Sequence, residues 1–274
     1  MLNELPQPIA NSTKKGATFV HWLIAIPFTA ALGIEIAFYC FHISFLGRFD
    51  SVLVLLAAAS TLAGMWRRLP LQNIFLAALG VAIIGGGFSA LGAKTGLPFG
   101  PFLYTSQMEP LLFNTLPWAM PIIWIIIVLA SRGVARLILR PWRKTKNYGF
   151  RNIGLTALLV VLFDVAFEPY VFQVKHYWLW SPTKLPVSWE GVPLINFLAW
   201  GLVATLILFF IAPVLIVKKP RSKMGPDLHP LGVWVGCVVL FGAGCAATGI
   251  WLAVIADVAI IIGTMAFAIR GAFW

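Results

Sequence analysis

Eight long apolar runs constrain the fold of this chain more than any other feature. A helix needs about 20 mostly apolar residues to cross the hydrocarbon core of a bilayer, and the chain is 60% hydrophobic and only 11% charged. The runs cover roughly residues 17–44, 51–66, 73–92, 117–139, 153–174, 192–217, 230–248 and 250–269. We predict an all-α, polytopic membrane helix bundle of about eight transmembrane helices, or seven if the last two runs form one broken hairpin. Residues 17–270 are expected to be a single transmembrane domain that follows a polar cytoplasmic tail, 1–16.

The basic residues predict how the bundle is oriented. The net charge is +11, from 20 Lys and Arg against nine Asp and Glu. In the eight-helix arrangement only Arg48, Lys94, Lys175 and Lys184 fall on one side, and the other 16 basic residues fall on the side of both termini. The positive-inside rule then predicts a multi-pass protein of the inner (plasma) membrane with cytoplasmic termini. This asymmetry favours contact with anionic lipid and argues against a nucleic-acid partner.

One basic cluster follows the fourth apolar run. It consists of Arg136, Arg140, Arg143 and Lys144. Its position at the expected membrane surface indicates an interfacial anchor.

Metal and cofactor motifs are absent from the sequence. The three cysteines, Cys40, Cys237 and Cys245, form no C-x-x-C pair, and the four histidines are scattered over both sides. There is no Asp-x-x-Asp run that would hold Mg²⁺ on a diphosphate, no phosphate-binding loop and no dinucleotide fingerprint. We therefore predict no metal site, no disulfide framework and no cofactor.

Two carboxyl groups stand out inside the fifth run. Asp164 and Glu168 are four residues apart, so they share one face of a helix. Burial of such a pair in hydrocarbon costs several kcal/mol unless the groups are neutralised or paired. Either the pair performs acid–base chemistry, or it binds helices together through Lys175, His176 or Asn196.

Further polar and aromatic features fall on the same, outer side. Residues 93–116 contain too much Gly and Pro for a helix and too many apolar residues for an aqueous loop, so we expect an outer lid or re-entrant segment. Residues 175–191 form an outer loop rich in aromatic side chains, as in an interfacial belt. The acidic residues expected on this side are Glu35, Glu109, Asp164, Glu168, Glu190 and Asp257. Glu35 is expected either to line a polar cavity or to reach the headgroup layer.

Two blocks of sequence resemble the signature blocks of the integral-membrane carotenoid biosynthesis proteins. The first reads Gly92-x-x-Thr95-Gly96-x-Pro98-Phe99-Gly100-x-x-x-Tyr104-Thr105. The second contains Asp164-x-x-x-Glu168-Pro169, then Trp178-x-Trp180, then Gly191-Val-Pro193-Leu-x-Asn196-Phe-x-x-Trp200. Characterised members of that family hydrate the terminal 1,2 double bond of acyclic carotenoid ends. The resemblance implies a cofactor-independent hydro-lyase with a hydrophobic carotenoid substrate; it does not indicate an oligomeric state.

The chain departs from the family pattern at three positions. Ser89 stands where the family often has a glutamate, Phe102 where tyrosine is usual, and Glu109 where glycine is common. The loss of one carboxyl group and the gain of another nearby predict either compensation, with Glu109 as a catalytic residue, or an altered reaction.

Hydration of an isolated alkene needs a proton donor, a group that stabilises a tertiary cation and a positioned water. Two neighbouring carboxyl groups in a low dielectric cannot both ionise readily, so one of Asp164 and Glu168 is expected to keep its proton as general acid while the other activates water. Aromatic faces stabilise cations, and Asn196 is expected to hold the water. The candidate substrate-binding residues are Thr95, Tyr104, Trp178, Trp180, Asn196, Trp200, Glu35 and Ser89.

Two other functions remain open at this point. An end-group cyclase or isomerase begins with the same protonation, but an internal double bond and not water captures the cation. A non-catalytic carotenoid-binding or assembly subunit would leave the pigment unchanged. The mass of the product distinguishes the three. A transporter is disfavoured because the sequence shows no convincing inverted repeat.

Overall fold

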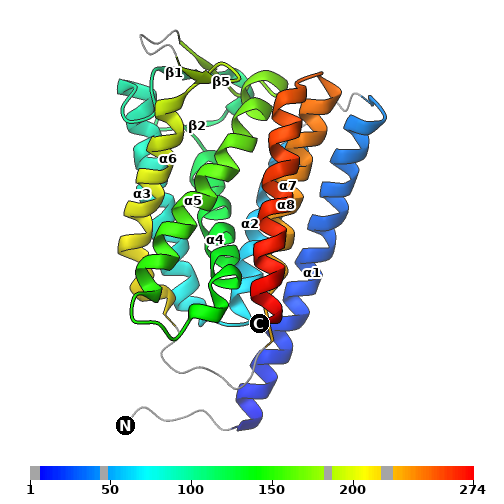
Figure 1. The fold of residues 1–274 in the computed structure, drawn as a ribbon, viewed down its shortest axis with the longest axis vertical. Helices are drawn as coiled ribbons and strands as arrows, with labels where there is room; N and C mark the ends of the chain where they lie inside the picture. The colour runs from blue at the N-terminus through cyan, green and yellow to red at the C-terminus, as the bar shows by residue number, and fades with distance from the viewer. Residues whose placement is uncertain (1–6, 44–48, 182–186, 217–224) are drawn as a thin grey trace.

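The computed structural model describes residues 7–43, 49–181, 187–216 and 225–274, with side chains from residue 16 onward. Eight helices in this part are long and apolar enough to cross a membrane (Figure 1), as predicted. Their bounds are α1 Gln7–Cys40, α2 Phe49–Trp66, α3 Leu71–Thr95, α4 Ala119–Ile138, α5 Tyr148–Pro169, α6 Leu194–Ile211, α7 His229–Ala247 and α8 Trp251–Phe273. The last two apolar runs are separate helices, so the count is eight rather than seven.

Several helices extend beyond their apolar runs. Helix α1 begins at Gln7, inside the segment expected to be a polar tail, and α5 begins at Tyr148, five residues before its apolar run. Pro8 is no obstacle, because the N–H groups of the first helical turn have no partner within the helix. Polar residues outside the hydrocarbon therefore continue a helix that hydropathy alone would end.

The helices run roughly along one axis, with α1 at one edge and α3 and α6 at the other (Figure 1). Helices α4 and α5 occupy the centre, since 61% of the most apolar window of each is buried, against 22% for α8. The start of α1 and the end of α8 lie at the same end of the bundle, here called the terminal end. The opposite end carries all the described strands and is called the strand end.

Short antiparallel ribbons close the strand end. They are β1 Phe102–Tyr104 with β4 Trp178–Trp180, β2 Leu111–Leu112 with β3 Leu116–Pro117, and β5 Ser188–Trp189 with β6 Val192–Pro193. The sequence did not predict them. The β1–β4 ribbon joins the Gly/Pro segment to the aromatic loop, and its register pairs Phe102 with Trp180 and Tyr104 with Trp178. Because strand side chains alternate, these four aromatics share one face while Leu103 and Leu179 are exposed on the other.

Short helical turns follow three of the long helices: η2 Arg140–Trp142 after α4, the π-helical η3 Tyr170–Val174 after α5, and η4 Ala212–Leu215 after α6. A further turn, η1 Ser106–Met108, lies between β1 and β2. The π-helical turn η3 extends α5 directly after Pro169 and leads into β4. It therefore links the acidic pair of α5 to the aromatic ribbon.

Candidate active site

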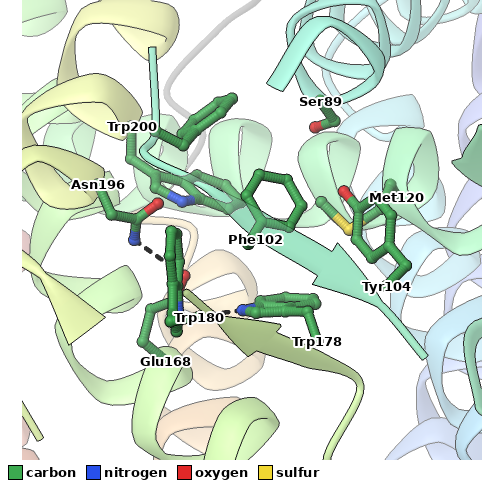
Figure 2. Close-up of a pocket in the computed structure, with 10 residues that line it drawn as sticks. Ser89, Phe102, Tyr104, Met120, Glu168, Trp178, Trp180, Asn196 and Trp200 are labelled. Carbon is green, nitrogen blue, oxygen red and sulfur yellow. Dashed lines mark hydrogen bonds between the residues drawn. The ribbon is translucent and has the colours of Figure 1, made fainter. Parts of the chain in front are cut away.

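A small cavity lies beneath the β1–β4 ribbon, between α3, α4, α5 and α6 (Figure 2). Its volume of ≈ 20 Å³ is enough for about one water molecule. The residues that line it are Ser89, Phe99, Phe102, Tyr104, Met120, Glu168, Trp178, Trp180, Asn196 and Trp200. Six of them were expected from the sequence as substrate-binding residues, and Glu168 as a catalytic one; Phe99, Phe102 and Met120 were not on either list.

Asn196 bridges the two carboxyl groups of α5. Its side-chain amide donates one hydrogen bond to Asp164 Oδ2 at 3.0 Å and another to Glu168 Oε1 at 2.8 Å. All three side chains are buried, and Asp164 Oδ1 has no hydrogen-bond partner among the described residues. The helical spacing of the acids thus places them on one face, and α6 supplies the amide that joins them.

Glu168 also accepts hydrogen bonds from the aromatic ribbon. The indole N–H groups of Trp178 and Trp180 donate to Glu168 Oε2 at 3.1 Å and 3.2 Å. With Asn196, Glu168 therefore has three N–H donors, whereas Asp164 has one. Donors of this kind stabilise the ionised form of a carboxyl group. The Trp-x-Trp spacing has a simple cause, because residues two apart in a strand point to the same side.

Pro169 connects a second part of the outer loop to α5. Proline has no N–H, so it cannot bond the carbonyl of Val165, four residues earlier. The indole N–H of Trp189 donates to that carbonyl at 3.0 Å. A partly buried carbonyl that has no partner within its own helix thereby fixes β5 over the helix that carries the acids.

Ser89 and Trp200 line the side of the cavity away from Glu168, and Trp124 packs behind them. Trp124 of α4 stacks on Trp200 with a centroid distance of 4.0 Å and donates its indole N–H to Ser89 Oγ at 2.9 Å. Gly85 makes room for this ring, because a Cβ there would collide with Trp124. Sequence reasoning missed Trp124, although an indole N–H inside a membrane helix needs an acceptor and Ser89 is a polar residue of the neighbouring helix.

Tyr104 lies on the ribbon and faces the same space. Its ring meets Trp178 edge-on at 6.0 Å, and its hydroxyl lies toward Ser89 (Figure 2). Burial raises the pKa of the phenol above its usual value, although a hydrogen bond with Ser89 opposes the shift. Tyr104 therefore stays a neutral hydrogen-bonding group beside Ser89.

Four expected site residues lie outside the lining of this cavity: Asp164, which Asn196 joins to Glu168, and Glu109, Thr95 and Glu35. Glu109 is exposed and follows η1, and Thr95 is exposed and caps the turn after α3 by accepting from the N–H of Leu97. Glu35 is buried but accepts a hydrogen bond from Lys175 at 3.0 Å. Of the other acidic residues expected on this side, Asp257 lies in α8 against Gly242, and Glu190 contacts Gln173.

The expected cationic partners of the acid pair bind elsewhere. Lys175 Nζ contacts Asp50 at 2.8 Å as well as Glu35, and His176 Nδ1 lies 2.9 Å from the carbonyl of Phe172. Among the three candidates for pairing Asp164 and Glu168, only Asn196 contacts them. The carboxyl pair is thus held by neutral N–H donors, with no ion pair to either acid in the described part of the chain.

The arrangement brings two carboxyl groups, N–H donors and aromatic faces together at a water-sized space. Within the described residues, no group of three or more His, Cys, Asp or Glu side chains is placed to hold a metal ion. The groups that are present suit proton transfer to and from an apolar molecule.

Comparison with known proteins identifies a family whose match covers the cavity residues. The carotenoid biosynthesis protein family matches residues 49–264, which include every residue that lines the cavity. A relative, the bisanhydrobacterioruberin hydratase of Haloarcula japonica, is 26% identical over 138 residues; the match covers 49% of this chain and 44% of that protein. This chain thus spans less than half of the relative's length. No solved structure matches this chain. The chain belongs to the carotenoid biosynthesis protein family.

Proposed function

We propose that this chain is a carotenoid 1,2-hydratase, which adds water across the terminal double bond of an acyclic carotenoid end group. The observation that carries the proposal is the pair Asp164 and Glu168, bridged by Asn196 at an aromatic cavity with room for about one water. The distant relative named as a hydratase supports the same reaction. The overall reaction consumes only the alkene and water, so it needs no oxidant and no cofactor.

Glu168 is the carboxyl group placed to touch the substrate. It lines the cavity, whereas Asp164 lies one helical turn earlier in α5 and does not. When a protonated Glu168 gives its proton to the alkene, three N–H groups stabilise the carboxylate that forms. Donors that are already in position where charge develops lower the barrier without reorganisation. Asp164 shares the Asn196 amide and acts as the second proton carrier of the pair.

The chemical steps balance with one water. The O–H bond of Glu168 breaks and the π electrons form a new C–H bond, which leaves a cation on the more substituted carbon. The faces of Trp178, Trp180 and Trp200 stabilise that cation. The water oxygen then bonds to the cationic carbon, and its extra proton returns to the carboxyl pair. The hydroxyl of Tyr104 and the side-chain oxygen of Asn196 orient the water.

The cavity is smaller than an isoprenoid end group. A volume of ≈ 20 Å³ matches a single water, so the substrate must separate the lining aromatics when it enters. The β1–β4 ribbon contributes four of those side chains and is attached to the helices through short segments. We propose that movement of this ribbon admits the carotenoid end from the bilayer.

The orientation in the membrane follows from charge. Lysine and arginine residues concentrate at the terminal end, so the positive-inside rule places that end in the cytoplasm. The cavity then opens near the outer surface of the inner membrane, within reach of a lipid-dissolved pigment.

The proposal is tested by the pigments of cells that make lycopene or γ-carotene, with and without this chain. We expect a product that is heavier by one water for each end that is hydrated. A product isomeric with the substrate would indicate cyclisation or isomerisation instead. Unchanged pigment that co-purifies with the protein would indicate a binding subunit, and either result would overturn the hydratase proposal.

A further inference from the structure

A second and larger cavity lies at the terminal end, far from the acid pair. It has a volume of ≈ 250 Å³ and lies between the last turns of α2, the end of α4 and the start of α7. Its lining contains five arginines and one carboxylate: Arg68, Arg132, Arg136, Arg140, Arg143 and Asp227. The carotenoid chemistry proposed above uses none of these residues.

The spacing of the arginines on α4 and η2 places their side chains along one wall of this cavity. Arg132, Arg136 and Arg140 are separated by four residues each, so they stack on one helical face. Like charges at this spacing destabilise a helix by a few tenths of a kcal/mol per pair. A row of three, with Arg143 one turn further, is therefore unfavourable unless an anion lies against it.

The nearby carboxylate does not neutralise this row. Asp227 accepts from Arg67 at 2.6 Å and from Arg68 at 2.7 Å, so both its oxygens are already paired with cations. None of Arg132, Arg136, Arg140 and Arg143 has a carboxylate within 4.0 Å in the part of the chain that the structure describes. The described acidic residues other than Asp227 lie toward the strand end. Among the side chains that the structure describes, the arginines of this cavity therefore outnumber its carboxylates by five to one.

Carbonyl groups at helix ends hold two of these side chains in place. Arg132 donates to the carbonyl of Leu215 at 3.1 Å, and Arg140 donates to that of Ala272. Each guanidinium has five N–H donors, so most remain available. At Gly133 the start of α7 packs so tightly on α4 that a Cβ would collide with Pro230, which fixes one wall. The arginines thus line a space between helix ends and the segment before α7, in addition to facing lipid headgroups from the surface as the sequence suggested.

We propose that this cavity binds the phosphate group of an anionic ligand. Guanidinium groups pair with phosphate oxygens in a two-point geometry, and several on one wall match a phosphate mono- or diester or a diphosphate. Two sources share this chemistry: the headgroup of an anionic lipid, since the cavity lies at the membrane surface, and a free diphosphate. Basic pockets between helices on the cytoplasmic side are a known mode of anionic-lipid binding.

The test uses the purified full-length protein in a neutral detergent. The probes are a short-chain phosphatidylglycerol, a short-chain phosphatidylcholine and inorganic diphosphate, and the readouts are Tm and the affinity from its concentration dependence. The variant is Arg136→Gln with Arg143→Gln, because neither side chain holds a carbonyl that the structure records. The matched control, Lys144→Gln with Arg151→Gln, removes the same charge from exposed positions of the same end that do not line the cavity.

The wild-type protein and the control are expected to gain several degrees in Tm with phosphatidylglycerol or with diphosphate, and none with phosphatidylcholine. A gain in Tm with phosphatidylglycerol alone identifies a lipid headgroup as the ligand. A gain in Tm with diphosphate identifies a free phosphate compound. The cavity variant is expected to bind at least tenfold more weakly than the control. Equal weakening in both variants, or no response to either anion, overturns the proposal.

A second measurement covers the case in which the cavity variant does not fold. Native mass spectrometry of the wild-type protein, from equal amounts of phosphatidylglycerol and phosphatidylcholine or from diphosphate, is expected to show retention of the anion. Retention of the two lipids without preference, together with no diphosphate adduct, contradicts an anion site.

Discussion

The amide of Asn196 donates one N–H to each of two carboxyl groups, and both donors are consumed by that task. The sequence had assigned Asn196 to the water; the structure shows its N–H groups on the acids, which leaves its carbonyl oxygen for other contacts. One neutral residue thereby holds Asp164 and Glu168 together without an ion pair. In the proposed reaction it is the burial of two neighbouring carboxyl groups, which cannot both ionise readily, that keeps a proton on the pair.

Two tryptophan–serine pairs offer a matched comparison of single residues. Trp124 donates to Ser89 at the cavity, and Trp234 donates to Ser131 elsewhere in the core at 3.1 Å. Ser89→Ala and Ser131→Ala each leave a buried indole N–H without an acceptor, at a cost of about 1 kcal/mol. We expect similar losses in Tm for both variants, but reduced hydration only for Ser89→Ala. Equal hydration rates in the two variants would argue against a role for Ser89 at the site.

For single residues, the sequence predicted those site residues whose positions depend only on spacing within one element. The spacing of Asp164 and Glu168 places them on one face of a helix, whatever surrounds that helix. Trp124 was missed because its role depends on Gly85, 39 positions earlier, being small enough for the ring to cross from α4 to α3. Such a contact depends on how helices pack, which no local pattern encodes.

Among the elements, α3 shapes the cavity through its glycines. A Cβ at Gly85 would displace the Trp124 ring, whereas a Cβ at Gly87 would meet no atom within 4 Å. We predict that Gly85→Ala lowers stability by about 1–3 kcal/mol through overpacking and lowers hydration because Trp200 loses its stacking partner. Gly87→Ala adds the same methyl group to the same helix and should leave both properties unchanged. Urea or thermal unfolding in detergent, with parallel assays of activity, measures the difference.

A partly buried ion triad joins three elements at the strand end. Lys175 follows η3 and contacts Glu35 of α1 and Asp50 of α2. Burial lowers the pKa of Lys175, but the charge of Asp50 and a hydrogen bond with it, followed by Tyr39, outweigh burial and raise that pKa above the usual value. A raised lysine pKa stabilises the fold fully below the unfolded pKa of about 10.4, and the effect is lost only at higher pH.

The triad therefore predicts that wild type is more stable than a variant without the lysine charge, by an amount that does not change between neutral and moderately alkaline pH. Lys175→Gln leaves Glu35 buried without its cation and should cost about 1–3 kcal/mol. The gap in Tm between wild type and variant is expected to stay constant from about pH 7 to 9.5. Lys94→Gln, at an exposed lysine of the same end, is the control and should change little. A gap that closes within this range would contradict the charged triad.

Hydropathy predicted the eight helices because a membrane span must be apolar along its whole length. It did not predict the β1–β4 ribbon, whose strands are about 75 residues apart in the chain and three residues long. Short strands of this kind form because the surrounding helices bring their ends together. Apolar, aromatic sequence such as Trp178-Leu-Trp180 is equally typical of an interfacial loop.

For the whole molecule, the orientation is testable with the natural cysteines. Cys40 is exposed at the strand end, while Cys237 and Cys245 are buried. We predict that a membrane-impermeant maleimide labels intact spheroplasts of wild type at Cys40, and that Cys40→Ser abolishes the labelling. Labelling that requires permeabilised membranes would place the strand end in the cytoplasm and reverse the proposed orientation.

The molecule as a whole separates two kinds of chemistry between its ends. Neutral N–H donors and aromatic rings surround the acids at the strand end, and arginines line a cavity at the terminal end. The arginine spacing was visible in the sequence, and the concentration of Lys and Arg residues on one side predicted the orientation in the membrane. That the side chains enclose a cavity could not be predicted, because it depends on how the start of α7 packs against α2 and α4.

The origin of the product oxygen tests the central claim most directly. Purified protein in liposomes receives an acyclic carotenoid in water labelled with heavy oxygen, and the product is analysed by mass spectrometry. We predict one labelled oxygen for each hydrated end, with a rate that falls by roughly 10²–10⁴-fold in Glu168→Gln and is retained in Glu190→Gln, which alters a carboxyl group outside the cavity. An oxygen-free isomer, an unchanged pigment, or full turnover by Glu168→Gln would contradict hydration by this acid pair.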